Sequence, residues 1–140
     1  MSGSLPASAP AATPHASFLS FDFGTRCVGV AAGNSVTRTA QPLGSIAATG
    51  APRFDSIARY IADWQPDALV VGVPFHPDGA AHENTDRARR FARQLRGRFG
   101  LQVHEVDERY TTTEAHSMDV ADVDAASAAI ILEQHLRALP

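Results

Sequence analysis

The spacing of apolar residues divides the chain into a β-rich first part and an alternating second part. Residues 1–16 are rich in Ser, Ala and Pro, and we expect a disordered tail there, followed by one domain over 17–140. Apolar runs at residues 18–23, 28–32 and 36–46 predict three strands, with Pro42 marking the third as an edge strand. Because the connections are short, the three strands are expected to form an antiparallel meander.

Helical and strand patterns alternate in the rest of the chain. Apolar residues at helical spacing predict helices over 52–64, from Asn84 or Thr85 to 99, and over 122–138, and a capping box at Thr111 and Glu114 predicts a short further helix. Apolar runs at 67–73 and 101–106 predict two strands between them. Strand–helix–strand alternation favours parallel crossovers, so we expect an α/β fold: a mixed five-stranded sheet with helices on both faces.

Composition narrows the function classes. The 140 residues suffice for one core, and the net charge of −3 argues against a wholly basic nucleic-acid binder. All 12 basic residues are arginine, which excludes mechanisms that need a lysine amine, and the lone Cys27 excludes an intramolecular disulfide. Apolar runs are too short to span a membrane and no basic residue precedes Arg26, so we expect a cytoplasmic protein. Either a monomer or a homodimer is expected.

Asp22 lies between Phe21 and Phe23 near the end of a predicted core strand. Burying an ionised carboxylate is costly unless it is paired or holds a metal, which favours a functional role. The alternative is a strand-end aspartate that closes a turn with Gly24 and Thr25.

Two further acidic clusters follow in the second half. Asp107 and Glu108 come directly after a predicted strand, where sites gather in open α/β sheets, although a solvated turn is an equal alternative. Asp119, Asp122 and Asp124 precede the last helix, where at least two of them are expected to be ordinary capping residues. Carboxylates from separate elements can hold two Mg²⁺ or Mn²⁺ ions and hydrolyse phosphodiester bonds.

Basic and imidazole side chains gather around the second of the longer helices. Six of the twelve arginines lie within it or at its end: Arg87, Arg89, Arg90, Arg93, Arg96 and Arg98. Arg89, Arg93 and Arg96 share a face opposite the apolar stripe, which indicates either a solubilising surface or a patch that contacts phosphate. The preceding loop carries His76 and His82, which are either solvated or in contact with substrate.

Four motifs in order resemble the YqgF/RuvX family of bacterial pre-16S rRNA nucleases and Holliday-junction resolvase-like proteins: FDFGTRCVGVA (21–31), ALVVGVPFHPDG (68–79), DERYTTTEA (107–115) and VDAASAAIILEQHL (123–136). The resemblance runs from residue 18 to 136 and implies an RNase H-like fold. It implies a nuclease for the 5′ end of 16S rRNA, or else a resolvase of branched DNA. Asp22, Glu108 and Asp124 would be the catalytic ligands of Mg²⁺ or Mn²⁺.

On this hypothesis Thr25, Arg26, Arg109, Arg89 and Arg93 would contact the nucleic acid, either structured pre-rRNA or branched DNA. The chain departs from the family at Cys27, at residues 75–77, and at residues 116–122, which are short and acidic where relatives usually have a longer, often basic loop. That loop favours, as an alternative, a non-catalytic RNA-binding assembly factor. A nucleotide-binding ATPase of the actin type would need a second domain, for which 140 residues leave no room.

Overall fold

The computed structural model describes residues 16–110 and 122–140, which form one five-stranded sheet and its helices. The strands are β1 (Ser17–Phe23), β2 (Val28–Asn34), β3 (Ala40–Ile46), β4 (Ala68–Val73) and β5 (Gln102–Asp107), in the spatial order β3-β2-β1-β4-β5. β1 to β3 pair antiparallel, whereas β4 runs parallel to both β1 and β5. The predicted mixed sheet is confirmed, with β3 at its edge.

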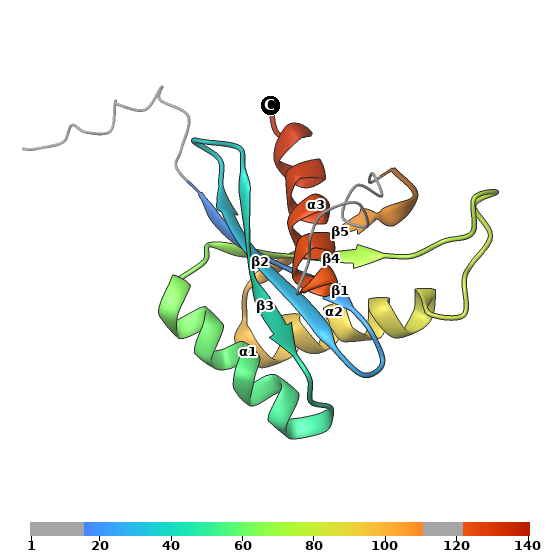
Figure 1. The fold of residues 1–140 in the computed structure, drawn as a ribbon, viewed down its shortest axis with the longest axis horizontal. Coiled ribbons are helices and arrows are strands. Elements are labelled where there is room, and N and C mark those ends of the chain that lie inside the picture. The colour runs from blue at the N-terminus through green and yellow to red at the C-terminus, as the bar shows by residue number, and fades with distance from the viewer. Residues whose placement is uncertain (1–15, 111–121) are drawn as a thin grey trace, which may run out of the picture.

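Helices cover both faces of the sheet, as predicted (Figure 1). α1 (Gly50–Trp64) and α2 (Thr85–Phe99) lie on one face and α3 (Val123–Arg137) on the other, and a 3₁₀ turn at Glu108–Tyr110 follows β5. The helix predicted at Thr111 and Glu114, and the predicted tail apart from residue 16, lie outside the described residues. No helix in the described part of the chain is long and apolar enough to cross a membrane.

The third strand begins at residue 40 rather than at the predicted 36. The side-chain oxygen of Asn34 accepts hydrogen bonds from the backbone N–H groups of Val36 and Thr37, both at 2.9 Å, and Arg38 has a φ of 57°. These contacts close a turn over the first residues of the predicted strand. Thr-rich composition alone does not distinguish such a turn from a strand. The residue that closes the turn is Asn34, which lies before the Thr-rich stretch.

Side-chain alternation along β1 decides which face each residue serves. Leu19 and Phe21 point toward α1 and α2, where they are buried in the main core with Phe91. Phe18 packs on the opposite face against α3, and the Ser20 hydroxyl donates a hydrogen bond to the backbone oxygen of Ala128 in α3 at 2.7 Å. Because faces alternate every residue, Asp22 continues the Phe18–Ser20 row and lies on the α3 face.

A histidine of α3 contacts a histidine of β5 on the face of the sheet that α3 covers. The rings of His104 in β5 and His135 in α3 lie 4.7 Å apart, and both contact the ring of Phe18. Burial lowers the pKa of both side chains from 6.5; the charge of Arg96 adds to this for His104, and His104 adds to it for His135. Since both are harder to protonate when folded, they stabilise the fold above about pH 6.5 and this contribution is lost as pH falls.

We therefore expect His135→Phe to gain stability relative to wild type as the pH falls from 7 to 5. The phenyl ring keeps the apolar contact with Phe18 and cannot be protonated. Melting temperatures of both proteins at pH 5, 6 and 7 measure the effect. Parallel curves for the two proteins would show that the histidine pair does not control acid stability.

Candidate active site

Asp22 sits between two glycines in the sheet. It is paired with Gly29 of β2 on one side and with Gly72 of β4 on the other. A Cβ atom at Gly29 would lie 1.9 Å from the backbone oxygen of Asp124, so the first turn of α3 rests directly on β2. A Cβ atom at Gly72 would lie 2.9 Å from the Glu108 Oε2 atom. The glycines thus clear the space on either side of Asp22 into which α3 and Glu108 enter.

The three carboxylates that the family resemblance selects are electrostatically close. Burial raises the pKa of Asp22 from 3.8 to about 8, and the negative charges of Glu108 and Asp124 add to this effect. Burial also raises the pKa of Glu108, with a smaller contribution from Asp107. A group of acids that resists ionisation in this way would gain free energy from a nearby cation.

The donor set fits a hard divalent cation. Asp22, Glu108 and Asp124 offer only carboxylate oxygens, the ligands that Mg²⁺ and Mn²⁺ prefer. Within residues 16–110 and 122–140, however, no three His, Cys, Asp or Glu side chains converge closely enough to form a ready-made metal site. The three acids are therefore neighbours whose side chains would have to close around an ion.

Asp122 and Asp124 have different surroundings at the start of α3. The Asp122 carboxylate caps the helix: it accepts a hydrogen bond from the backbone N–H of Ala125 at 2.9 Å and another from the Ser45 hydroxyl. Asp124 lies in the first turn, and its charge acts on Asp22. Asp122 is thus the capping residue expected in this cluster, whereas Asp119 lies outside the described residues.

Two of the five residues expected to contact nucleic acid lie close together. The guanidinium carbons of Arg89 in α2 and Arg109 after β5 lie 5.3 and 5.7 Å from the centre of the Phe75 ring. Arg89 forms an ion pair with Glu105 at 3.3 Å. Arg109 binds Asp107 at 2.7 Å, and this hydrogen bond is the main reason that the pKa of Asp107 is lowered. Both arginines are therefore positioned by acidic neighbours.

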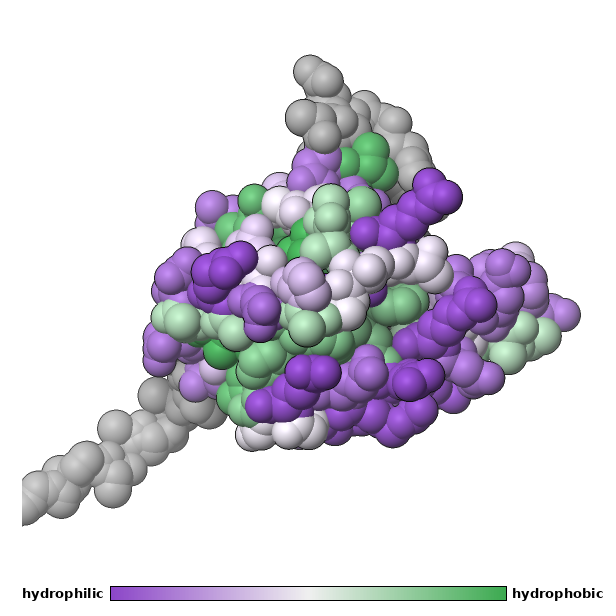
Figure 2. Space-filling view, turned by 90° about the horizontal axis from the view of Figure 1, so that it is seen from below, coloured by the Kyte–Doolittle hydropathy of each residue, from purple (hydrophilic) through white to green (hydrophobic). Residues whose placement is uncertain are grey.

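The other three lie on exposed surface. Thr25 and Arg26 belong to the turn between β1 and β2 that directly follows the end of the Asp22 strand. Arg93 lies on the outer face of α2, where all six arginines are exposed. Figure 2 shows hydrophilic residues along the sides and lower part of the face seen from below Figure 1, around a middle that is paler or hydrophobic.

The sequence interpretation missed one cation that supports the site. Arg53, in the first turn of α1, is only 6% exposed. Its Nε–H group donates to the backbone oxygen of Ala48 at 2.7 Å, and its Nη2 group donates to that of Thr25 at 3.2 Å. The buried guanidinium thereby ties α1 to the turn that carries Thr25 and Arg26. Arginine side chains are usually exposed, so residue type gave no sign that Arg53 is buried. The one sequence signal was its position four residues before Ile57, on the same buried face of the helix.

Gly29, Gly72 and Phe75 were also missed as parts of the site. A glycine inside a strand often marks a close approach of another backbone or side chain, and this signal was present at Gly29 and Gly72. Phe75 had no comparable signal, because its role depends on arginines that are remote in sequence.

Comparisons with known proteins agree with this architecture. The family model described as "RuvX: Holliday junction resolvase" matches residues 16–138. A protein of Polaromonas sp. curated as "Putative pre-16S rRNA nuclease" is 64% identical over 135 residues, covering 93% of this chain and 98% of its own. A protein of the same name from Albidiferax ferrireducens is 66% identical over 122 residues, covering 87% and 78%.

A solved structure gives the fold independently. RuvC of Thermus thermophilus, in complex with a Holliday junction substrate, superimposes with a TM-score of 0.54 at 15% sequence identity, covering 88% of this chain and 94% of that one. The expected RNase H-like fold is thereby confirmed. The family match over nearly the whole chain, together with the close relatives, shows that this protein belongs to the RuvX family.

Proposed function

We propose that the chain is a nuclease that hydrolyses phosphodiester bonds with Mg²⁺ or Mn²⁺ and matures the 5′ end of pre-16S rRNA in the cytoplasm. The observation that carries the proposal is that Glu108 and the Asp124 backbone at the start of α3 approach the two glycines that flank the partly buried Asp22. The name of the close relatives supports the choice of rRNA as substrate.

Asp22, Glu108 and Asp124 would hold the metal. When bound, a divalent cation supplies an activated water and stabilises the leaving oxygen. Asp22, whose pKa is about 8 without metal, must lose its proton to act as a ligand near neutral pH. Arg109, kept in place by Asp107, and Arg89, kept in place by Glu105, would orient the phosphate beside the acids.

The function is tested by incubating the protein with a pre-16S rRNA fragment that retains its 5′ leader and, separately, with a four-way DNA junction. We expect cleavage of the RNA that requires Mg²⁺ or Mn²⁺ and stops with EDTA, and none with Asp22→Asn. Cleavage of the junction alone would favour the resolvase alternative. RNA binding without cleavage under either metal would favour a non-catalytic assembly factor.

The outer face of α2 gives a separate prediction. Arg93 is exposed and Arg89 is about half exposed, so both are available to phosphate. We expect charge reversal of Arg89 and Arg93 to weaken RNA binding. The slope of the logarithm of the binding constant against the logarithm of the salt concentration should become shallower by roughly 0.7–0.9 for each phosphate that the protein no longer neutralises. Titrations at several salt concentrations measure this. Arg137→Glu, at the end of α3 on the other face of the sheet, is the control for a charge reversal elsewhere on the surface, with one arginine reversed instead of two. An unchanged slope in the double variant would assign these arginines to solubility alone.

A further inference from the structure

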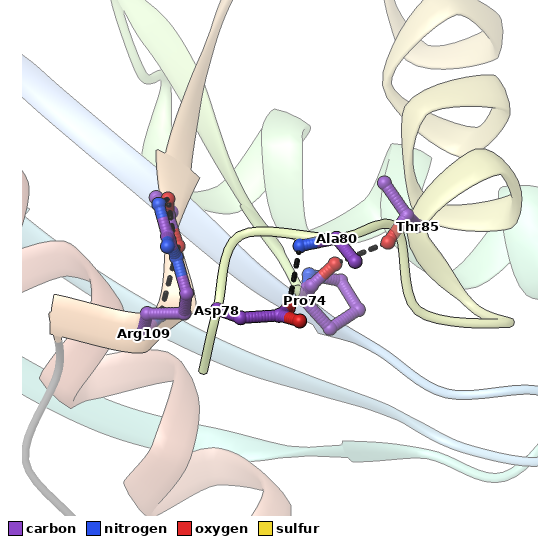
Figure 3. Close-up of polar contacts among 6 residues, drawn as sticks. Pro74, Asp78, Ala80, Thr85 and Arg109 are labelled. Atoms are coloured by element: carbon purple, nitrogen blue, oxygen red, sulfur yellow. Dashed lines mark hydrogen bonds and ion pairs between the residues drawn. The ribbon is translucent and has the colours of Figure 1, made fainter. Parts of the chain in front are cut away.

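The loop that follows β4 is a closed hairpin. Phe75 and Ala81 form an antiparallel bridge, and the backbone N–H of His76 donates to the oxygen of Ala80 at 2.9 Å. At the tip, the Asp78 carboxylate accepts a hydrogen bond from the backbone N–H of Ala80 at 2.8 Å (Figure 3). The loop therefore has a fixed shape of its own and projects from the end of β4.

Thr85 fastens the base of this hairpin. Its side chain is buried, with only 1% of the residue exposed. The hydroxyl donates to the backbone oxygen of Pro74 (Figure 3). It also accepts from the backbone N–H of His82, so one residue of α2 joins both ends of the loop. The backbone N–H of Asn84 donates to the Nδ1 atom of His82 at 3.1 Å, which fixes the orientation of that imidazole ring.

The fixed hairpin holds two imidazole rings side by side. The ring centres of His76 and His82 lie 5.0 Å apart at an angle of 45°, and His76 is exposed. No third His, Cys, Asp or Glu side chain in the described residues joins them in a metal-binding group. Two pre-arranged aromatic rings at a surface suit contact with another flat ring.

The hairpin is also adjacent to the carboxylates. It begins directly after β4, whose Gly72 lies between Asp22 and Glu108. Its Gly79 approaches Arg109: a Cβ atom at this glycine would lie 3.1 Å from the Nη1 atom. The histidine rings, the guanidinium groups of Arg109 and Arg89 and the acids thus lie near the ends at which β4 and β5 leave the sheet.

We propose that His76 and His82 form a stacking site for an unpaired nucleobase next to the phosphate that is cleaved. This inference rests on the proposed nuclease function and specifies the form of its substrate. In a duplex the faces of the bases are covered by their neighbours, whereas an unpaired nucleotide can place its base on the rings while its phosphate meets Arg109 and Arg89. The hairpin would therefore select single-stranded RNA at the cleavage position.

Binding of a single-stranded RNA that carries 2-aminopurine at one position tests the proposal, with the full chain and no added metal. We expect the fluorescence to be quenched at one position of the label, and His76→Ala to abolish this quenching and weaken binding about 10-fold. His76→Phe should restore both, because it keeps an aromatic ring. Binding of a blunt RNA duplex should be the same for all three proteins.

Trp64→Ala is the matched control. Trp64 is also an exposed aromatic residue, at 43%, but it ends α1 and so precedes β4 instead of following it. This variant should bind like wild type. Unchanged single-strand binding in His76→Ala, or an equal loss on single strand and duplex, would overturn the stacking site. Quenching by a protein that cleaves no RNA would support the site and refute the nuclease function, so the two proposals can fail separately.

Discussion

Asp22→Asn is expected to abolish cleavage while leaving the metal-free protein at least as stable as wild type. The amide removes a charged ligand from the centre of the acidic group, and several kcal/mol of lost transition-state stabilisation correspond to a rate about 10³-fold lower. Most inactivating substitutions at buried positions also reduce stability. Here activity should be lost without a loss of stability, because burial and the neighbouring acids disfavour the ionised Asp22 side chain in the folded protein.

The sign of the stability effect follows from the raised pKa of Asp22. A carboxyl group with a pKa of about 8 in the folded state and 3.8 in the unfolded state stabilises the fold fully below pH 3.8. This stability is lost as the pH rises toward 8, by an amount on the order of 5 kcal/mol. An asparagine does not titrate, so its contribution stays constant across this range.

Urea unfolding in EDTA at pH 5 and pH 8, combined with single-turnover cleavage at saturating metal, measures both effects. We expect the variant to gain stability relative to wild type as the pH rises. Asp63→Asn, at an exposed position of α1, is the matched control and should change neither quantity. Cleavage at the wild-type rate, or a variant that is less stable than wild type at pH 8, would contradict the assignment of Asp22.

Gly29→Ala is expected to disrupt both stability and activity through a single methyl group. The new Cβ atom would lie 1.9 Å from the backbone oxygen of Asp124 and 2.9 Å from the backbone nitrogen of Ala125. Both atoms belong to backbone at the first turn of α3 and cannot move aside as a flexible side chain would. The helix start must shift, at a cost of about 3 kcal/mol or more.

Activity should fall with stability, because the same shift moves Asp124 away from Asp22. Denaturant unfolding and cleavage at a temperature where the variant is still folded distinguish the two losses. Gly97→Ala is the control, because this glycine lies within α2 with no atom near its Cβ position. Alanine should increase the free energy of unfolding by about 0.5–1 kcal/mol there. Normal unfolding and cleavage by Gly29→Ala would mean that α3 does not rest on β2.

Local pattern predicted the sheet, its edge strand and the helices on both faces, because periodicity reports which side of each element is buried. Asp22 was also accessible to sequence reasoning, since a carboxylate between two phenylalanines near the end of a strand is unusual. Which of Asp122 and Asp124 caps α3 was not accessible in this way. The Asp122 carboxylate also accepts a hydrogen bond from the hydroxyl of Ser45, which lies 77 positions away along the chain.

The strand register explains other gaps in the sequence interpretation. Whether Gly29 and Gly72 flank Asp22 depends on how β2 and β4 align with β1, and a shift of one residue would exchange the faces. The burial of Arg53 depends likewise on two backbone carbonyls, at Ala48 and Thr25, that become available only when α1 packs beside the β1–β2 turn.

The row formed by Gly29, Asp22 and Gly72 has a consequence for recognising active members among distant sequences. The acid alone is a weak criterion, because aspartate at the end of a strand also closes ordinary turns. An acid with a glycine at the paired position on each neighbouring strand is a far more demanding pattern, since a larger residue at either place would displace a partner carboxylate. A homologue that keeps the aspartate but carries bulky residues at both flanking positions should have lost the hydrolytic reaction while keeping the fold.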